Sequence, residues 1–257
     1  MSRKIIDDSY EQRMFHAWTQ EYYDGSDFYN FGYWDENTRS PKEASENLVD
    51  KLLEFIPEKR GKILDIACGL GATTRHLLEY YPPEQVMGIN ISSTQLQRSR
   101  LNVPECSFLV MDATALAFGS EVIDAAICVE AAFHFVTRER FLTEVYRVLR
   151  PGGHLVLSDI VITWWAAQVN RRTPKANWVS SLAEYESIYR QIGFVDVKVI
   201  SAKQECWGAF DAYVRRWHRA KIAAGQISPA VYPRLIVQQT IANAGIRSYV
   251  LASATKP

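Results

Sequence analysis

The sequence lacks the features that mark several classes of protein. Its 29 basic and 29 acidic residues cancel, so no excess of charge favours binding to nucleic acid or to an anionic membrane. No apolar run is long enough to cross a bilayer, and the polar start Met-Ser-Arg-Lys does not lead into a secretory signal peptide. We therefore expect a cytoplasmic protein with no nucleic-acid or membrane partner.

Cysteine is also scarce. The four cysteines, Cys68, Cys106, Cys128 and Cys206, show no paired spacing of the kind that holds a metal ion. Most of them fall in expected strands or beside a glycine turn. We therefore expect reduced, buried thiols and no bound metal.

An alternation of strands and helices predicts the fold. The 257 residues contain no obvious linker and suit a single α/β domain over residues 1–257. Two of the expected helices begin at capping boxes, Ser40 to Glu43 and Ser181 to Glu184. The alternation indicates a parallel sheet with helices on both faces. Apolar runs predict its strands at residues 62–67, 85–90, 106–111, 122–129, 154–162, 194–200 and 246–254.

Three segments fall outside this alternation. Residues 1–40 include the aromatic, turn-rich stretch 22–34 and are expected to form an N-terminal lid arm. Residues 163–180 and 206–244 contain five of the seven tryptophans. Because ligands of open α/β sheets bind beyond the carboxyl ends of the strands, these two segments are expected to cap a site there.

A glycine turn joins the first strand to the next helix, in the sequence GKILDIACGLGATTRHLL (residues 61–78). The backbone N–H groups of such a turn form a polar cradle for a ligand. A dinucleotide-binding turn has a third glycine beneath the pyrophosphate, and here Thr74 stands in its place. Asp65, at the end of the strand, would repel a pyrophosphate but attract an ammonium group. The turn therefore favours a nucleoside that carries an amino acid, S-adenosyl-L-methionine (SAM).

Five motifs follow one another along the chain. They are ILDIACGLG (63–71), GINISSTQ (88–95), MDATALAF (111–118), EAAFHF (130–135) and RVLRPGGHLVLSD (147–159). In these motifs the chain resembles the class I SAM-dependent methyltransferases, and most closely those that methylate small molecules such as natural products and sugars. The resemblance implies a Rossmann-like, doubly wound sheet of seven strands, the last of them antiparallel. It also implies a small-molecule acceptor bound beneath the cap segments.

The resemblance assigns cofactor contacts to residues in four regions of the chain. These are Asp65 and the backbone of Ala67, Gly69 and Gly71 for the methionine end; Asn90 and Gln95, with Ile91, for the ribose side; Asp112 and Ala113 for the adenine; and Tyr33 or Trp34 from the arm. Asn90 is a departure, because many relatives have an acid there and an amide binds a hydroxyl more weakly. Three alternatives stay open: Gln95 as an exposed helix residue, Asp112 as a turn cap, and the aromatic arm as simple packing on the core.

The same resemblance places the base for the acceptor at His134, with Asp159 beside it. Each follows or ends an expected strand, so both are expected on one rim of the sheet, facing the transferred methyl group. A neutral imidazole suits the deprotonation of a hydroxyl near neutral pH, and the carboxylate would fix its tautomer. Glu130 would orient the site or only cap a helix. The alternative is that His134 packs on the adenosine and Asp159 is a turn acid.

The expected reaction is methyl transfer from SAM to a hydroxyl of a secondary metabolite or sugar. Transfer to carbon or nitrogen of a terpenoid, quinone-like or amine acceptor stays open, because the fold does not choose the acceptor atom. A nicotinamide-dependent oxidoreductase is disfavoured by Thr74 and by Asn90 in place of an acid. A non-catalytic subunit would have a broken SAM motif, which this chain does not show. A homo-oligomer is compatible with the sequence.

Overall fold

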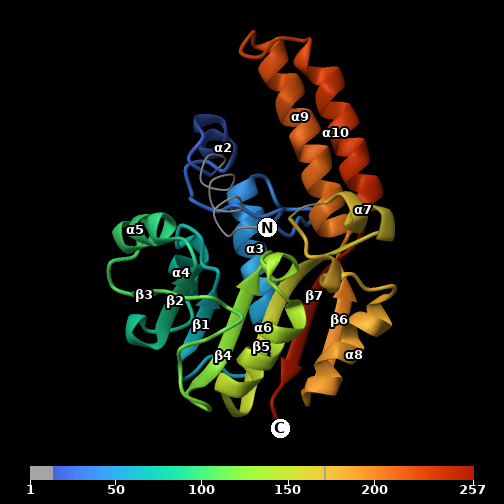
Figure 1. The fold of residues 1–257 in the computed structure, drawn as a ribbon. Coiled ribbons are helices and arrows are strands. Elements are labelled where there is room, and N and C mark those ends of the chain that lie inside the picture. The colour runs from blue at the N-terminus through green and yellow to red at the C-terminus, as the bar shows by residue number, and fades with distance from the viewer. Residues whose placement is uncertain (1–13, 171) are drawn as a thin grey trace.

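The computed structural model describes residues 14–170 and 172–257. Its centre is a seven-stranded sheet in the order β3-β2-β1-β4-β5-β7-β6 (Figure 1). Strands β1 to β5 pair in parallel, whereas β7 lies antiparallel between β5 and β6. The expected doubly wound sheet with an antiparallel last strand is confirmed. The strands are β1 Ile63–Ile66, β2 Val86–Asn90, β3 Ser107–Val110, β4 Ile123–Val129, β5 Leu149–Ile162, β6 Val195–Ser201 and β7 Ile246–Thr255.

Helices cover both faces of this sheet because its strands alternate buried side chains between the two faces. In β4, Ile127 packs with the core under α3, while Ala126 and Cys128 pack with the core under α6 and α8. The helices that cover the two faces are α3 Pro41–Leu53, α4 Ala72–Leu77, α5 Ser93–Asn102, α6 Arg138–Val148 and α8 Leu182–Ile192.

The capping boxes act as expected. The Ser40 hydroxyl accepts a hydrogen bond from the Glu43 N–H, and the Ser181 hydroxyl accepts one from the Glu184 N–H. Most strand ends differ from the sequence expectation by one residue, and the largest difference is the start of the fifth strand, expected at residue 154. Strand β5 begins at Leu149, which pairs with Ile123 of β4, and Gly152 and Gly153 exchange backbone hydrogen bonds with Lys256 beyond the end of β7.

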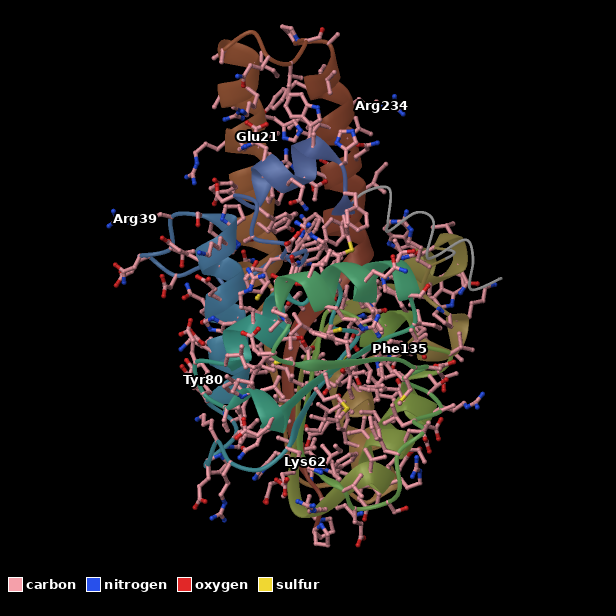
Figure 2. All side chains as sticks on the ribbon, turned by 90° about the vertical axis from the view of Figure 1, so that its left-hand side faces the viewer. Glu21, Arg39, Lys62, Tyr80, Phe135 and Arg234 are labelled. Atoms are coloured by element: carbon pink, nitrogen blue, oxygen red, sulfur yellow. The ribbon has the colours of Figure 1, made fainter. Side chains whose placement is uncertain are left out.

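The remaining elements lie at the carboxyl ends of the parallel strands. Helices α9 and α10 form a hairpin that projects away from the sheet (Figure 1). The N-terminal arm packs on this hairpin: Trp18 and Trp217 have ring centroids 5.7 Å apart, and Glu21 forms an ion pair with Lys221 (Figure 2). Residues 1–13 of the predicted arm lie outside the described residues. These elements are α2 Ala17–Tyr22, α7 Trp164–Val169, α9 Ala209–Ala223 and α10 Val231–Gly245.

No helix among the described residues is long and apolar enough to cross a membrane. The four cysteines are free; three are buried and Cys106 is partly buried. Residues 14–170 and 172–257 contain no group of three or more His, Cys, Asp or Glu side chains placed to hold a metal ion.

Candidate active site

Two adjoining spaces lie beyond the carboxyl ends of β1, β4 and β5. The smaller, here the glycine-turn pocket, has a volume of about 160 Å³ and is lined by the turn after β1 and by residues 90–95. The larger, here the aromatic cavity, has a volume of about 720 Å³ and lies beneath the α9–α10 hairpin. Four residues line both spaces and are called the junction residues: Tyr29, Asn30, Glu130 and His134.

The glycine-turn pocket owes its shape to backbone that only small residues adopt easily. Ala67 and Gly69 line it with positive φ angles of 61° and 57°. Gly71 does not line the pocket, and its predicted ligand contact stays a prediction. It begins α4 with φ 87°, and a Cβ there would lie 3.2 Å from the Ser99 Cβ. Gly71 therefore allows α4 to pack closely against α5.

Asp65 is the charged group of the glycine-turn pocket. Its side chain is 1% exposed, and burial raises its pKa to about 7. The Thr74 hydroxyl donates a 2.6 Å hydrogen bond to Asp65 Oδ2. Sequence reasoning treated Thr74 only as a missing glycine, although its place in the first turn of α4 points back at the end of β1. Thr74 does not line the pocket itself but holds the carboxylate that does.

An amide pair forms another wall of the same pocket. The Asn90 Nδ2 donates to Gln95 Oε1 at 2.8 Å, and Ile91 lines the pocket beside them. Gln95 is 7% exposed, so the alternative of an exposed helix residue is wrong.

Asp112 and Ala113 lie outside the lining of both spaces. The Asp112 carboxylate caps its own turn by accepting from the Thr114 N–H and hydroxyl at 2.9 and 2.8 Å. This is the turn-cap geometry that the sequence left open, and the adenine contact stays a prediction.

The arm reaches the site through residues other than those predicted. Tyr33 and Trp34 line neither space. The Trp34 Nε1 donates to the Phe31 carbonyl at 2.8 Å, and its ring packs 4.8 Å from the ring of Tyr213. Asp27 to Asn30 and Met14 instead form the arm's wall of the glycine-turn pocket. The arm has no regular secondary structure over this stretch, so no periodic pattern in the sequence predicts which of its residues face the site.

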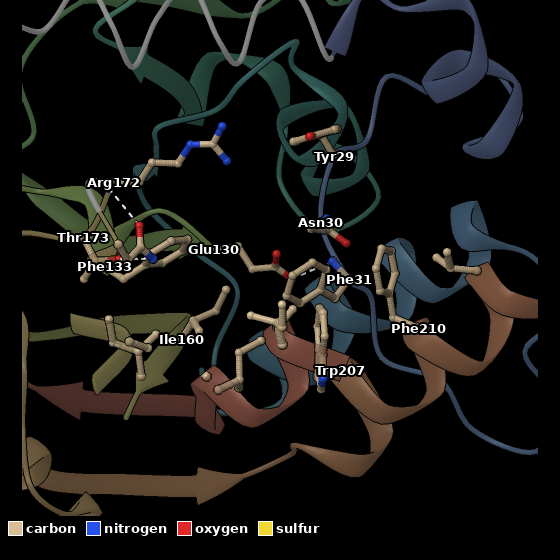
Figure 3. A pocket seen from close by; sticks show the side chains of 18 of the residues that line it. Tyr29, Asn30, Phe31, Glu130, Phe133, Ile160, Arg172, Thr173, Trp207 and Phe210 are labelled. Atoms are coloured by element: carbon tan, nitrogen blue, oxygen red, sulfur yellow. Dashed lines mark hydrogen bonds between the residues drawn. The ribbon is translucent and has the colours of Figure 1, made fainter. Parts of the chain in front are cut away.

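Glu130 is a junction residue at the end of β4. Its Oε1 accepts two hydrogen bonds of 2.7 Å, from the Phe31 N–H and the Tyr249 hydroxyl. Its other oxygen has no hydrogen-bond partner among the described residues. Burial raises the pKa of this carboxyl to about 8. Figure 3 shows the Glu130 side chain reaching toward Phe31 of the arm.

His134 ends the short 3₁₀ turn Ala132–His134 that follows β4. Its Nδ1 lies 2.9 Å from the Arg172 carbonyl oxygen. A carbonyl only accepts hydrogen bonds, so Nδ1 carries the hydrogen of the neutral ring and Nε2 carries the lone pair. Burial lowers the pKa of His134. The ring is therefore neutral near pH 7, in the tautomer that leaves Nε2 basic.

Asp159 does not join His134, and this prediction is wrong. Its side chain is fully buried, lines neither space, and pairs with Arg138 Nε at 2.7 Å. The reason is the period of a strand, in which successive side chains point to opposite faces. Ile160 lines the aromatic cavity, so Asp159 points toward α6 and α8, where the Tyr185 hydroxyl donates to it at 3.0 Å.

Aromatic and aliphatic side chains line most of the aromatic cavity. They come from the arm, from the turn after β4 and from both segments that the sequence set outside the alternation. They include Tyr22, Tyr23, Phe31, Phe133, Trp165, Trp207, Phe210, Trp217 and Ile241.

Comparison with known proteins places this fold and site. Residues 64–157, from β1 into β5, match the family described as a methyltransferase domain. The chain therefore contains a methyltransferase domain. The residues outside the match, on both sides of it, include the arm, the hairpin and most of the lining of the aromatic cavity.

Two methyltransferases of known name are also similar to this chain in sequence. Erythromycin 3''-O-methyltransferase of Saccharopolyspora erythraea is 26% identical over 258 residues, which cover 90% of this chain and 84% of that protein. Methyltransferase GfsG of Streptomyces halstedii is 32% identical over 173 residues, and the match covers 62% of its length.

Solved structures share the fold. Geranyl diphosphate C-methyltransferase from Streptomyces coelicolor has a TM-score of 0.70 at 14% identity, covering 98% of this chain and 97% of that chain. Phosphoethanolamine N-methyltransferase 2 of Haemonchus contortus has a TM-score of 0.70 at 20% identity, and the match covers 60% of it.

Proposed function

We propose that this methyltransferase methylates a hydroxyl group on a small molecule with a large apolar body. The observation that carries this proposal is the junction. Glu130 and His134 line both the glycine-turn pocket and the aromatic cavity, so a donor in one and an acceptor in the other meet at the same side chains.

The residues of the glycine-turn pocket fit SAM. Asp65 is a buried carboxyl group of the pocket, and the ammonium group of SAM would pair with its ionised form. The backbone at Ala67 and Gly69 leaves room for the methionine end, and the Asn90–Gln95 pair offers amide groups to the ribose hydroxyls. Bound SAM supplies a methyl group on a positively charged sulfur.

His134 is the base in this proposal. Its Nε2 lone pair accepts the proton of the acceptor hydroxyl as the oxygen takes the methyl group, and its Nδ1–H stays held by the Arg172 carbonyl. Because burial lowers its pKa, the ring is unprotonated and ready at neutral pH. The surrounding aromatic side chains exclude water that would compete for the methyl group.

The cavity also indicates the class of acceptor. A volume of about 720 Å³ with mostly aromatic and aliphatic walls suits a polycyclic, macrocyclic or terpenoid body rather than a bare sugar. At the junction, Asn30 Oδ1 is buried with no hydrogen-bond partner among the described residues, and Asn30 lines the cavity. An amide oxygen accepts hydrogen bonds, so the methyl acceptor would present a further donor group there. The O-methyltransferase of S. erythraea supports oxygen as the acceptor atom.

Carbon methylation is the second candidate. The specific observation in its favour is the ring of aromatic faces around the cavity, including Phe31, Phe133 and Trp207, which would stabilise a cationic product by cation–π contact. The free cysteines support a place in the reducing cytoplasm for either reaction.

A labelled-methyl transfer assay tests the proposal. The purified protein is given SAM with a labelled methyl group and a panel of apolar alcohols and phenols, alongside matched alkenes and amines of the same carbon skeletons. The expected product is a methyl ether, identified by NMR. Label found only on carbon or nitrogen would contradict hydroxyl methylation.

A further inference from the structure

The loop that follows α7 holds the turn that carries His134. We propose that Asn177, in this loop, is a positioning residue that fixes His134 at the junction. The inference rests on the proposed role of His134 as the base. It gives Asp159 and Arg138 a role as the anchor of this loop.

Asn177 binds the backbone on both sides of His134. Its Nδ2 donates to the carbonyl oxygens of Phe133 and Phe135 at 3.1 and 2.8 Å. One amide nitrogen therefore uses both of its hydrogens on the two residues that flank His134. The side chain is 4% exposed, so these bonds are formed away from competing water.

The same loop holds the imidazole ring. The Arg172 carbonyl, earlier in the loop, accepts from His134 Nδ1 at 2.9 Å. The tautomer of a histidine is set by the hydrogen bond that its other nitrogen makes. Asn177 fixes the backbone of the turn and Arg172 fixes the ring, so movement of the loop would release both.

A buried ion pair anchors the loop in turn. The Arg138 N–H donates to Asn177 Oδ1 at 2.7 Å, and the Arg138 guanidinium donates to the Asn177 carbonyl at 2.6 Å. The guanidinium also pairs with Asp159, and the two side chains are 2% and 0% exposed. A buried pair of this kind contributes geometric definition more than net stability. Asp159 therefore acts on His134 at a distance, through Arg138 and Asn177.

Asn177→Asp tests this inference. The carboxylate keeps an acceptor for the Arg138 N–H but donates nothing to Phe133 and Phe135. The measurement is nitrogen-15 NMR of the imidazole in histidine-labelled protein, with His134→Gln used to assign the signal. In the native protein we expect hydrogen on Nδ1 and a lone pair on Nε2. In Asn177→Asp we expect a mixture of tautomers.

Kinetics give a second readout with the acceptor found in the transfer assay. We expect the turnover of Asn177→Asp to fall by about tenfold or more, with the Kd for SAM within about threefold of the native value. The matched control is Tyr189→Phe, which removes the buried 3.1 Å hydrogen bond from Tyr189 to the Tyr185 hydroxyl without touching the loop. This control should leave the His134 signals unchanged.

Two results would overturn the inference. One is a native His134 spectrum in Asn177→Asp, and the other is an equal change in Tyr189→Phe. If Asn177→Asp does not fold, Arg138→Lys replaces it, because lysine keeps the charge but loses the fork that reaches both Asp159 and the Asn177 carbonyl. If His134→Ala retains turnover, the base role fails, and the spectra still decide the positioning role.

Discussion

The N–H of Phe31 donates a 2.7 Å hydrogen bond to Glu130 Oε1, joining the N-terminal arm to the end of β4. These two residues lie 99 positions apart in the sequence. Since Asn30 immediately precedes Phe31 and lines both spaces, this bond sets where the arm closes over the junction. The carboxyl group that holds the arm is therefore also one of the walls of the junction.

The first prediction is that Glu130→Ala loosens the arm. The Phe31 N–H loses its partner, and a lost buried hydrogen bond costs about 1–3 kcal/mol, which corresponds to about 5- to 150-fold faster amide exchange. Exchange at Phe31 is measured by mass spectrometry or NMR. The matched control is Tyr249→Phe, which removes the other donor to Glu130 and leaves the Phe31 bond in place. Unchanged exchange in Glu130→Ala would contradict the role of this contact.

A related prediction concerns the arm and residues 206–244 together. Both contribute side chains to the aromatic cavity, so we expect both to become more protected from amide exchange when the demethylated product of SAM and an acceptor are added. Residues of β4 serve as the internal control, because the sheet core is protected in either state. Equal protection of the arm and the hairpin with and without ligand would show that they are fixed structure.

A third prediction is that SAM binds through Asp65 in a pH-dependent way. An ionised carboxylate attracts the ammonium group and a protonated one does not. Because burial raises the Asp65 pKa to about 7 in the free protein, affinity should rise as pH increases through about 7 and then level off. Calorimetry from pH 5.5 to 8.5 measures this, because a free Asp, with a pKa of about 3.9, stays ionised throughout that range. Asp65→Ala should weaken binding by about 30-fold or more above pH 7 and should remove the rise in affinity with pH.

Thr74→Val is the matched variant for this test. It keeps the shape of the side chain but removes the 2.6 Å hydrogen bond to Asp65, which favours the ionised carboxylate. The midpoint of the affinity curve should therefore move to higher pH, while the affinity well above it changes little. A midpoint at the same pH as in the native protein would contradict the role assigned to Thr74.

The sequence predicted the sheet and the glycine turn well because their signals are local. Strands buried on both faces are apolar throughout, and Asp65 ends such a run just before Gly69. Asp159 was misplaced because its motif indicates a strand there, but not which face of the sheet the side chain takes. The roles of Asn177 and Thr74 come from contacts across the fold, to Phe133 and to Asp65, and no periodic pattern marks such residues. For the arm, the sequence predicted the right segment but the wrong residues, because an irregular backbone has no period to show which side chains face the site.

The last prediction concerns His134. Replacing it with alanine removes the Nε2 lone pair from the junction, and we expect turnover to fall by about two to four orders of magnitude. The affinity for SAM should change little, because Asp65 and the glycine turn hold the methionine end. In the native protein, burial lowers the His134 pKa, so turnover should fall only as pH drops below about 6.5, the value for an ordinary histidine. Steady-state kinetics across pH, with SAM affinity measured in parallel, checks both points. Retained turnover with weakened SAM binding in His134→Ala would show that this histidine packs on the cofactor and is not the base.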